Sequence, residues 1–266
     1  MNRDALLKLM QDVAAGALAP ADASERLQHL ACEDIGFAHI DHHRSLRKGF
    51  PEVIFGEGKT AEQICGIMER MTVQETVVLA TRVDAAKAQA VLARFPQARY
   101  HAEARMLVWE TTPVTVNGRG TILVLAAGTS DLPVAMEAYL TAKAMGHSVE
   151  RIVDVGVAGI HRLFRHRDAI EQATVLIVVA GMEGALPSVI SGLVGVPVIA
   201  VPTSIGYGAS FSGLAALLGM LNSCASGVSV GASGFSSRWE ASSSASEGSS
   251  DKAERPRSSR KVLVVA

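Results

Sequence analysis

From residue 118 onward, short apolar runs alternate with glycine-containing turns and with stretches whose apolar residues recur at helical spacing. A strand, a glycine loop and a helix follow one another four times in this order. Such a repeat predicts an α/β domain with a parallel, doubly wound sheet in three αβα layers and right-handed crossovers. The predicted strands are Thr121–Ala126, Ser148–Val153, Thr174–Ala180 and Val196–Val201, and helices are expected after them near residues 131–145, 160–167, 186–193 and 211–223.

Residues 1–117 show a less regular mixture of helical and strand patterns. Thr60 and Gln63 have the spacing of a capping box, which predicts that a helix begins there. The apolar stretch Glu75–Val83 predicts a buried strand, and Asp84 is placed to cap the helix that follows it. We therefore expect a smaller domain of mixed α/β structure over this first part of the chain.

The composition changes abruptly at Gly231. Serine makes up more than a third of residues 231–260, and no apolar period is present there. A segment of this kind cannot bury enough apolar surface to offset the entropy of ordering. We expect residues 231–266 to form a disordered tail, which leaves residues 118–230 as the doubly wound domain.

The overall composition limits the classes of protein that need to be considered. Hydrophobic residues make up 48% of the 266 residues, which is enough to bury a substantial core. The 25 Lys and Arg residues nearly balance the 26 Asp and Glu residues, for a formal net charge of -1. Neither nucleic acid nor an anionic membrane is therefore expected as a partner.

Cysteine usage and the length of the apolar runs indicate a cytoplasmic protein. Cys32, Cys65 and Cys224 are far apart and lack zinc-site spacing, so a disulfide framework is not expected. The first 20 residues carry Asp4 and Asp12 among apolar positions, which predicts an amphipathic helix rather than a signal peptide. The other apolar runs are too short to span a bilayer.

The loop Gly128–Asp131, with the sequence GTSD, joins a predicted buried strand to a helix. Backbone N–H groups at a helix start, together with the hydroxyls of Thr129 and Ser130, suit a phosphate. Asp131 is a candidate acid or metal ligand, although capping of the helix explains it equally well. The GxGxxG fingerprint is absent, so nicotinamide-dependent redox chemistry has no support from a motif.

Two acidic residues follow predicted strands at the same edge of the sheet. Asp154 comes directly after the second strand and would face a ligand crevice, with a salt bridge to Arg151 or His161 as the alternative. Glu183 lies between Gly181 and Gly184 in an apolar loop. We expect it to be half-buried with a raised pKa, which suits a general acid or base, whereas a charge at a helix N-terminus is the simpler interpretation.

Two further groups admit either a structural or a functional interpretation. The polar segment Asp41–Gly49 is expected to be a loop, and Arg44 and Arg47 within it could bind a phosphate or carboxylate or simply face solvent. Cys224 ends the last predicted helix. A free cysteine is more often a small buried residue than a nucleophile, and no cation adjoins this one in the sequence.

Long segments of the sequence resemble a known superfamily. The stretch AGMEGALPSVISGLVGVPVIAVPTS, with GTSD upstream, resembles the aminoimidazole ribonucleotide carboxylase/mutase fold. A closer resemblance is to a sibling family, the pyridinium-3,5-biscarboxylic acid mononucleotide synthases of nickel-pincer nucleotide biosynthesis. It covers about residues 1–230, and the segments that carry it are Asp41–Thr60, Ala126–Ala138, Asp154–Leu163, Gly181–Val189 and Ile205–Val230.

This resemblance implies conversion of nicotinic acid adenine dinucleotide, with CO2 or bicarbonate as co-substrate, into the biscarboxylated mononucleotide and AMP. An electron-poor pyridinium ring attacks CO2 only after a nucleophile has added beside C5. Cys224 matches the nucleophile of the family. Glu183 falls in its acidic loop and is the expected base for proton transfer, with Asp154 and Asp131 as second choices.

The resemblance also implies which residues bind the substrate. No tightly bound cofactor is expected, although Mg2+ could assist hydrolysis of the phosphoanhydride. The resemblance does not identify ligands for this metal. Related proteins form homo-oligomers, which implies an octamer. The residues expected to contact the substrate are Gly128, Thr129, Ser130, Asp131, Arg44, Arg47, Gly181 and Gly184.

Two departures from the family pattern leave other functions open. The mutases carry a histidine in the loop that corresponds to Gly184–Pro187, and this chain has none, which argues against a carboxyaminoimidazole ribonucleotide mutase. After Val230 the serine-rich segment replaces the usual Asn-Asp-Gly-aromatic run of the family. A nucleotide-binding protein with impaired catalysis is therefore a third interpretation.

Overall fold

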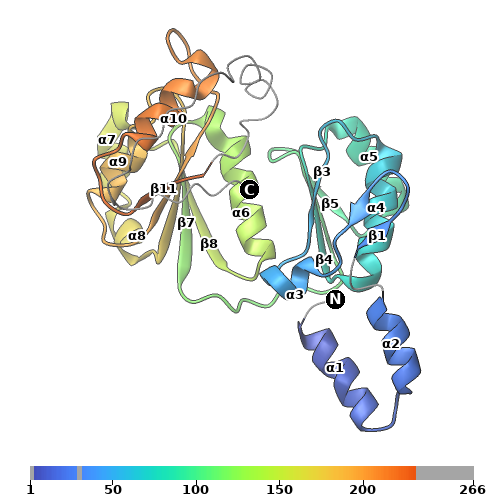
Figure 1. Cartoon of the computed structure of the whole chain (residues 1–266). Coiled ribbons are helices and arrows are strands. Elements are labelled where there is room, and N and C mark those ends of the chain that lie inside the picture. The colour runs from blue at the N-terminus through green and yellow to red at the C-terminus, as the bar shows by residue number, and fades with distance from the viewer. Residues whose placement is uncertain (1–2, 29–31, 232–266) are drawn as a thin grey trace, which may run out of the picture. The chain divides into compact units, whose positions relative to one another are not determined.

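The computed structural model describes residues 3–28 and 32–231, which form two compact units (Figure 1). One unit comprises Met1–Thr115 with Ala144–Gly146, and the other comprises Val116–Lys143 with His147–Ala266. Apart from Gly231, the predicted tail lies outside the described residues. No helix among the described residues is long and apolar enough to cross a membrane.

The N-terminal unit combines a mixed sheet with helices. Its four-stranded sheet has the order β3-β4-β6-β5, in which β3 and β4 are parallel and the other pairs are antiparallel. Strands β1 and β2 form a separate antiparallel pair. The elements are α1 (Arg3–Ala14), α2 (Pro20–Gln28), β1 (Glu33–Asp34), β2 (His39–Ile40), α3 (Arg44–Lys48), β3 (Val53–Phe55), α4 (Ala61–Gln74), β4 (Val77–Thr81), α5 (Ala85–Arg94), β5 (Arg99–His101) and β6 (Met106–Glu110).

The predicted capping box at the start of α4 is confirmed. The Gln63 backbone N–H donates to Thr60 Oγ1 at 3.2 Å, and the Thr60 N–H donates to Gln63 Oε1 at 3.0 Å. At the start of α5, the Lys87 N–H donates to Asp84 Oδ1 at 2.9 Å, so that cap is confirmed as well. These local interactions act over three residues, which explains why the sequence alone predicted them.

The prediction of a loop over the whole of Asp41–Gly49 is wrong, because α3 forms within it. Tertiary contacts favour the helix over a loop. Ser45 is buried, and its hydroxyl donates to Glu75 Oε1 at 2.6 Å. Gly49 ends the helix in a left-handed conformation, with its N–H donating to Ser45 O at 2.9 Å.

The C-terminal unit contains a five-stranded, fully parallel sheet with the order β11-β10-β9-β7-β8. Helix α6 packs on one face, and α7, α8, α9 and α10 pack on the other (Figure 1). The predicted three-layer doubly wound fold is therefore confirmed. The elements are β7 (Thr121–Ala126), α6 (Leu132–Ala144), β8 (Ser148–Val153), α7 (Ile160–Phe164), α8 (Arg167–Gln172), β9 (Val175–Ala180), α9 (Leu186–Ser191), β10 (Val198–Pro202), α10 (Leu214–Leu221) and β11 (Val228–Val230).

One strand and one helix of this unit differ from the sequence prediction. Strand β11 was not predicted, because three residues of sequence VSV are too short to show a strand pattern. It forms because it pairs in parallel with β10, with Val198 opposite Val228. The last predicted helix begins instead with a 3-10 turn, Phe211–Gly213, where Gly213 has a φ of 95°.

The capping box predicts a stability change that is specific to one position. Thr60→Ala should lower the free energy of unfolding by about 1 kcal/mol, because it leaves the Gln63 N–H without its side-chain acceptor. Chemical denaturation of the purified protein measures this change. The matched control is Thr72→Ala in the same helix, where alanine has the higher helix propensity and no loss is expected. Equal destabilisation by the two substitutions would contradict the capping argument.

Candidate functional site

The strand order creates a switch point at the carboxyl edge of the parallel sheet. From β7 the chain continues to β8 on one side, and β9 then lies on the other side of β7. Loops that leave such neighbouring strands diverge, and ligands of doubly wound sheets bind in the crevice between them. A pocket of about 290 Å³ lies there, lined by residues that follow β7, β8 and β9 and by Ile205 after β10.

Residues 128–131 form one wall of this switch-point pocket, and they are here called the phosphate loop after the group that the sequence predicts them to bind. This loop leads through a short 3-10 turn, Thr129–Asp131, into α6. Thr129 and Ser130 are exposed, and Ser130 lines the pocket. A Cβ added at Gly128 would meet only Asp131 Oδ2, at 3.6 Å. The space above Gly128 is therefore open to a ligand group.

Asp131 is buried beneath this loop, and it also belongs to the lining of the switch-point pocket. Its Oδ2 accepts from the Gly128 N–H at 3.0 Å, and its Oδ1 accepts from the Thr203 hydroxyl at 2.6 Å. Asp131 and Thr203 are each 4% exposed. Burial raises the pKa of Asp131, and the hydrogen bonds from Thr203 and Gly128 oppose that shift. The carboxyl group thus links the phosphate loop to the segment that leaves β10.

Glu183 lines the same pocket, but its expected burial is wrong. The side chain is exposed, so the desolvation argument for its role in acid–base chemistry does not apply. The glycines around it pack against backbone rather than against open space. A Cβ at Gly181 would lie 2.2 Å from Ile205 O, and one at Gly184, which has a φ of 67°, would lie 2.6 Å from Ala216 O.

Asp154 lies at the end of β8, as predicted, and forms an ion pair with Arg162. An ion pair was the structural alternative for Asp154, but its partner is Arg162 rather than Arg151 or His161. Arg162 lines the switch-point pocket, and Gly159 makes room for it, since a Cβ there would lie 2.6 Å from Arg162 Nε. Arg162 was not among the residues that the sequence predicted for the site. Its position one turn after Gly159, in the segment that follows β8, was the available signal.

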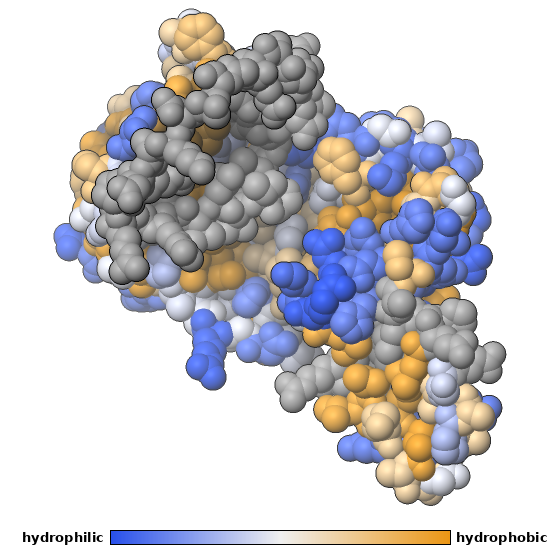
Figure 2. All heavy atoms as spheres, in the orientation of Figure 1, coloured by the Kyte–Doolittle hydropathy of each residue, from blue (hydrophilic) through white to orange (hydrophobic). Residues whose placement is uncertain are grey.

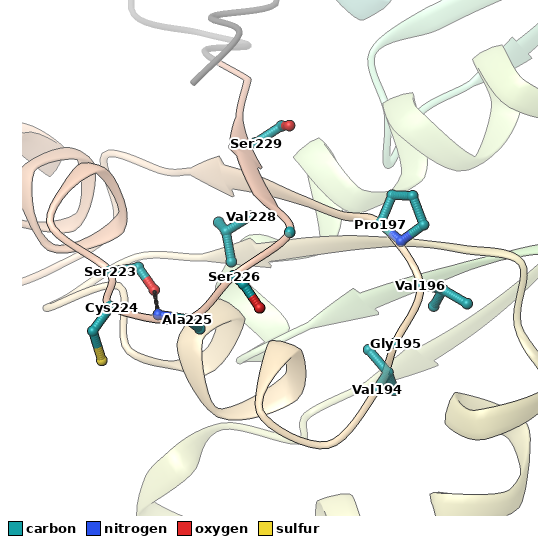
Figure 3. Close-up of a pocket in the computed structure, with 11 residues that line it drawn as sticks. Val194, Gly195, Val196, Pro197, Ser223, Cys224, Ala225, Ser226, Val228 and Ser229 are labelled. Atoms are coloured by element: carbon teal, nitrogen blue, oxygen red, sulfur yellow. Dashed lines mark hydrogen bonds between the residues drawn. The ribbon is translucent and has the colours of Figure 1, made fainter. Parts of the chain in front are cut away.

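Cys224 lies in a different pocket, at the amino edge of the sheet. The residues before β10 and β11 line this pocket, whose volume is about 750 Å³ (Figure 3). The Cys224 thiol is exposed, and none of the residues that line this pocket is charged. Next to it, the Ser223 hydroxyl accepts from the Ala225 N–H at 3.2 Å and from the Ser188 hydroxyl at 2.8 Å. Cys224 and Glu183 therefore line separate pockets of the single chain.

Arg44 and Arg47 lie on α3 in the N-terminal unit. Arg47 forms an ion pair with Asp41 at 2.6 Å, and this side-chain hydrogen bond lowers the pKa of Asp41 although partial burial opposes the shift. Among the described residues, no three His, Cys, Asp or Glu side chains gather to hold a metal ion. A magnesium ion that is bound mainly by substrate phosphates and water needs only one or two carboxylates. Asp131 and Glu183 are the carboxylates that line the switch-point pocket.

The raised pKa of Asp131 predicts that its contribution to stability depends on pH. Above its ordinary pKa of 3.8, the unfolded chain releases the proton, while the folded state retains it up to the raised pKa. The folded state then binds more protons, so the free energy of unfolding should fall as the pH rises through this window. Denaturation at a series of pH values measures the fall. Asp131→Asn does not titrate and serves as the reference, so parallel profiles of the two proteins would contradict the assignment.

Comparisons with known proteins agree with this architecture. The family model for the LarB/PurE-like N-terminal domain matches residues 32–111, and the model for AIR carboxylase matches residues 121–255. An uncharacterized protein of Methanocaldococcus jannaschii is 40% identical over 198 residues, which cover 72% of this chain and 76% of that protein. The chain therefore belongs to the AIR carboxylase family, in a LarB-like form that carries the LarB/PurE-like N-terminal domain.

Proposed function

We propose that this protein carboxylates the pyridinium ring of nicotinic acid adenine dinucleotide at C5, with CO2 or bicarbonate as co-substrate. Hydrolysis of the phosphoanhydride releases AMP and leaves pyridinium-3,5-biscarboxylic acid mononucleotide, a precursor in nickel-pincer cofactor biosynthesis. Membership of the AIR carboxylase family supports a carboxylase-related activity. The observation that best supports carboxylation of the dinucleotide is the exposed thiol of Cys224. It lines a pocket of the same parallel sheet that the phosphate loop follows.

The carboxylation needs the thiol because the ring begins as an electrophile. Cys224 Sγ, as the thiolate, adds to the ring carbon next to C5, and the ring electrons move onto the nitrogen. The resulting enamine is nucleophilic at C5 and forms the new C–C bond to CO2. Loss of the C5 proton to a base and departure of the thiolate then restore the aromatic ring. We assign the base to Glu183.

The hydrolytic half of the reaction needs a place for the two phosphates. The open space above Gly128 and the hydroxyl of Ser130 support binding of a phosphate in the switch-point pocket. Arg162, which is paired with Asp154, lines the same pocket, and the remaining N–H groups of its guanidinium can donate to the leaving phosphate. Mg2+, when bound to the phosphates, would supply further charge neutralisation.

The separation of the two pockets bears on the assembly of the enzyme. Glu183 follows β9 at the carboxyl edge, whereas Cys224 precedes β11 at the amino edge. We propose that the protein acts as a homo-oligomer, an octamer by family resemblance, in which Cys224 of one copy faces the switch-point pocket of another. The three unpaired cysteines suit the reducing cytoplasm, which we propose as its location.

Replacement of the thiol tests the proposed chemistry. Cys224→Ala should abolish formation of AMP and of the biscarboxylated mononucleotide but leave dinucleotide binding intact, because only the covalent step is lost. Mass spectrometry of the reaction mixture and calorimetric titration measure the two effects. Cys224→Ser should be almost as inactive, since a hydroxyl is a much weaker nucleophile. Full turnover by Cys224→Ala would exclude the adduct mechanism.

The same variant also tests the shared site. Mixed oligomers of Cys224→Ala and Glu183→Gln, two separately inactive proteins, should regain part of the wild-type activity if the site forms between copies. Mixtures that remain inactive after joint refolding would instead assign both residues to a single chain.

Arg162 should affect binding rather than covalent chemistry. Arg162→Ala should weaken binding of the dinucleotide roughly tenfold or more, because a charged hydrogen bond to phosphate contributes about 1.5–3 kcal/mol. Arg165→Ala is the matched control, since Arg165 is exposed on the same segment and does not line the pocket. Isothermal titration of both variants measures the difference. Equal affinities would remove Arg162 from the site.

A second candidate is favoured by the match to AIR carboxylase itself. A mutase would move the carboxylate of carboxyaminoimidazole ribonucleotide onto the imidazole ring. The loop Gly181–Pro187 contains no histidine, which counts against this activity. Adding that nucleotide to the same preparation decides between the two reactions, because only a mutase isomerises it. Binding of both nucleotides without turnover would indicate a catalytically impaired nucleotide-binding protein.

A further inference from the structure

We infer that residues 203–213, here called the aromatic loop, form a subsite for a planar aromatic ring beside the switch-point pocket, with Tyr207 and Phe211 as the stacking side chains. The identity of the ligand rests on the proposed function, whose dinucleotide carries two such rings, pyridinium and adenine. The placement of the subsite rests on the exposure, the anchoring and the position of the loop.

The aromatic loop presents unusually exposed side chains. Tyr207 is 82% exposed and Phe211 is 73% exposed, more than any other aromatic side chain among the described residues. Hydrophobic side chains stand at the outer tip of this loop, above α10 (Figures 1 and 2). Large aromatic side chains exposed on one loop are typical of a binding site, because each can stack on a planar partner.

The exposure is not a consequence of a loosely held loop. Thr203 at one end is buried and donates to Asp131, and Ile205 O accepts from the Met182 N–H at 2.9 Å. Ser210 is also buried, and its carbonyl accepts from the N–H groups of Gly213 and Ala215 at 3.0 and 3.2 Å. The inward residues therefore hold the backbone, while the aromatic residues between them point outward.

The loop is continuous with the switch-point pocket. Ile205 lines the pocket together with Met182, its backbone partner, and lies two residues before Tyr207. Through Thr203, the loop is joined to Asp131 and hence to the phosphate loop. A nucleotide joins its ring to its phosphate through one ribose, so a stacking surface next to a phosphate pocket matches the chemistry of a nucleotide.

The test is a titration of the full-length protein with three ligands: the dinucleotide, AMP and nicotinic acid mononucleotide. Tyr207→Leu and Phe211→Leu keep an apolar side chain but remove the ring. Each should weaken dinucleotide binding roughly fivefold to tenfold, as expected for loss of one stacking contact. Tyr207→Phe keeps the ring and should bind within about twofold of wild type. Phe164→Leu, an exposed aromatic on α7 outside the pocket lining, is the matched control and should not change affinity.

The two mononucleotides identify the ring. Weaker binding of AMP alone would assign adenine to the subsite, and weaker binding of nicotinic acid mononucleotide alone would assign the pyridinium ring. Unchanged affinity of both leucine variants for all three ligands would overturn the inference. A leucine variant that forms a smaller oligomer in light scattering, while its affinity per chain is unchanged, would also overturn the inference. The loop would then be a contact between copies.

Failure of this inference can be distinguished from failure of the proposed function. Wild-type turnover with unchanged binding by the leucine variants would overturn the ring subsite and leave the function in place. Binding of the dinucleotide without turnover, weakened in the leucine variants, would support the subsite and overturn the function. Absence of wild-type binding to all three ligands would overturn both.

Discussion

The pairing of β7 with β8 on one side and with β9 on the other is the constraint on which the site depends. Because all five strands run in parallel, the loops that leave β7, β8 and β9 lie at one edge of the sheet. The reversal of strand order at β7 separates these loops and leaves the pocket between them. Without this strand order, the phosphate loop, Arg162 and Glu183 would not line one pocket.

The buried carboxyl of Asp131 joins the parts of this edge that the sheet alone does not connect. It accepts one hydrogen bond from the phosphate loop and one from Thr203 after β10. Asp131, which the sequence offered as a possible ligand or acid, thus also holds two segments of the pocket wall together. The glycines around Glu183 have a similar role, since they let the loop after β9 approach the backbone of Ile205 and Ala216.

The candidate chemistry is divided between the two edges of the same sheet. The phosphate loop, Arg162 and the aromatic loop lie at the carboxyl edge, whereas the exposed Cys224 thiol lies at the amino edge. A single chain thus presents two separate pockets, and the proposed oligomer is the arrangement that would bring them together. Membership of the AIR carboxylase family supports a carboxylase-related function for this sheet edge.

The amino-acid sequence by itself determined the elements whose stabilising interactions are local. The four predicted strands of the parallel sheet, the capping box at Thr60 and the Asp84 cap all follow from residues close together in the chain. Tertiary structure decided the rest. Strand β11 exists because β10 lies beside it, α3 depends on the contact of Ser45 with Glu75, and the burial of Asp131 depends on Thr203, 72 residues away. The exposure of Glu183 and the place of Cys224 in another pocket have the same cause. The position of a side chain depends on how elements distant in the sequence pack, and a local sequence pattern does not predict that packing.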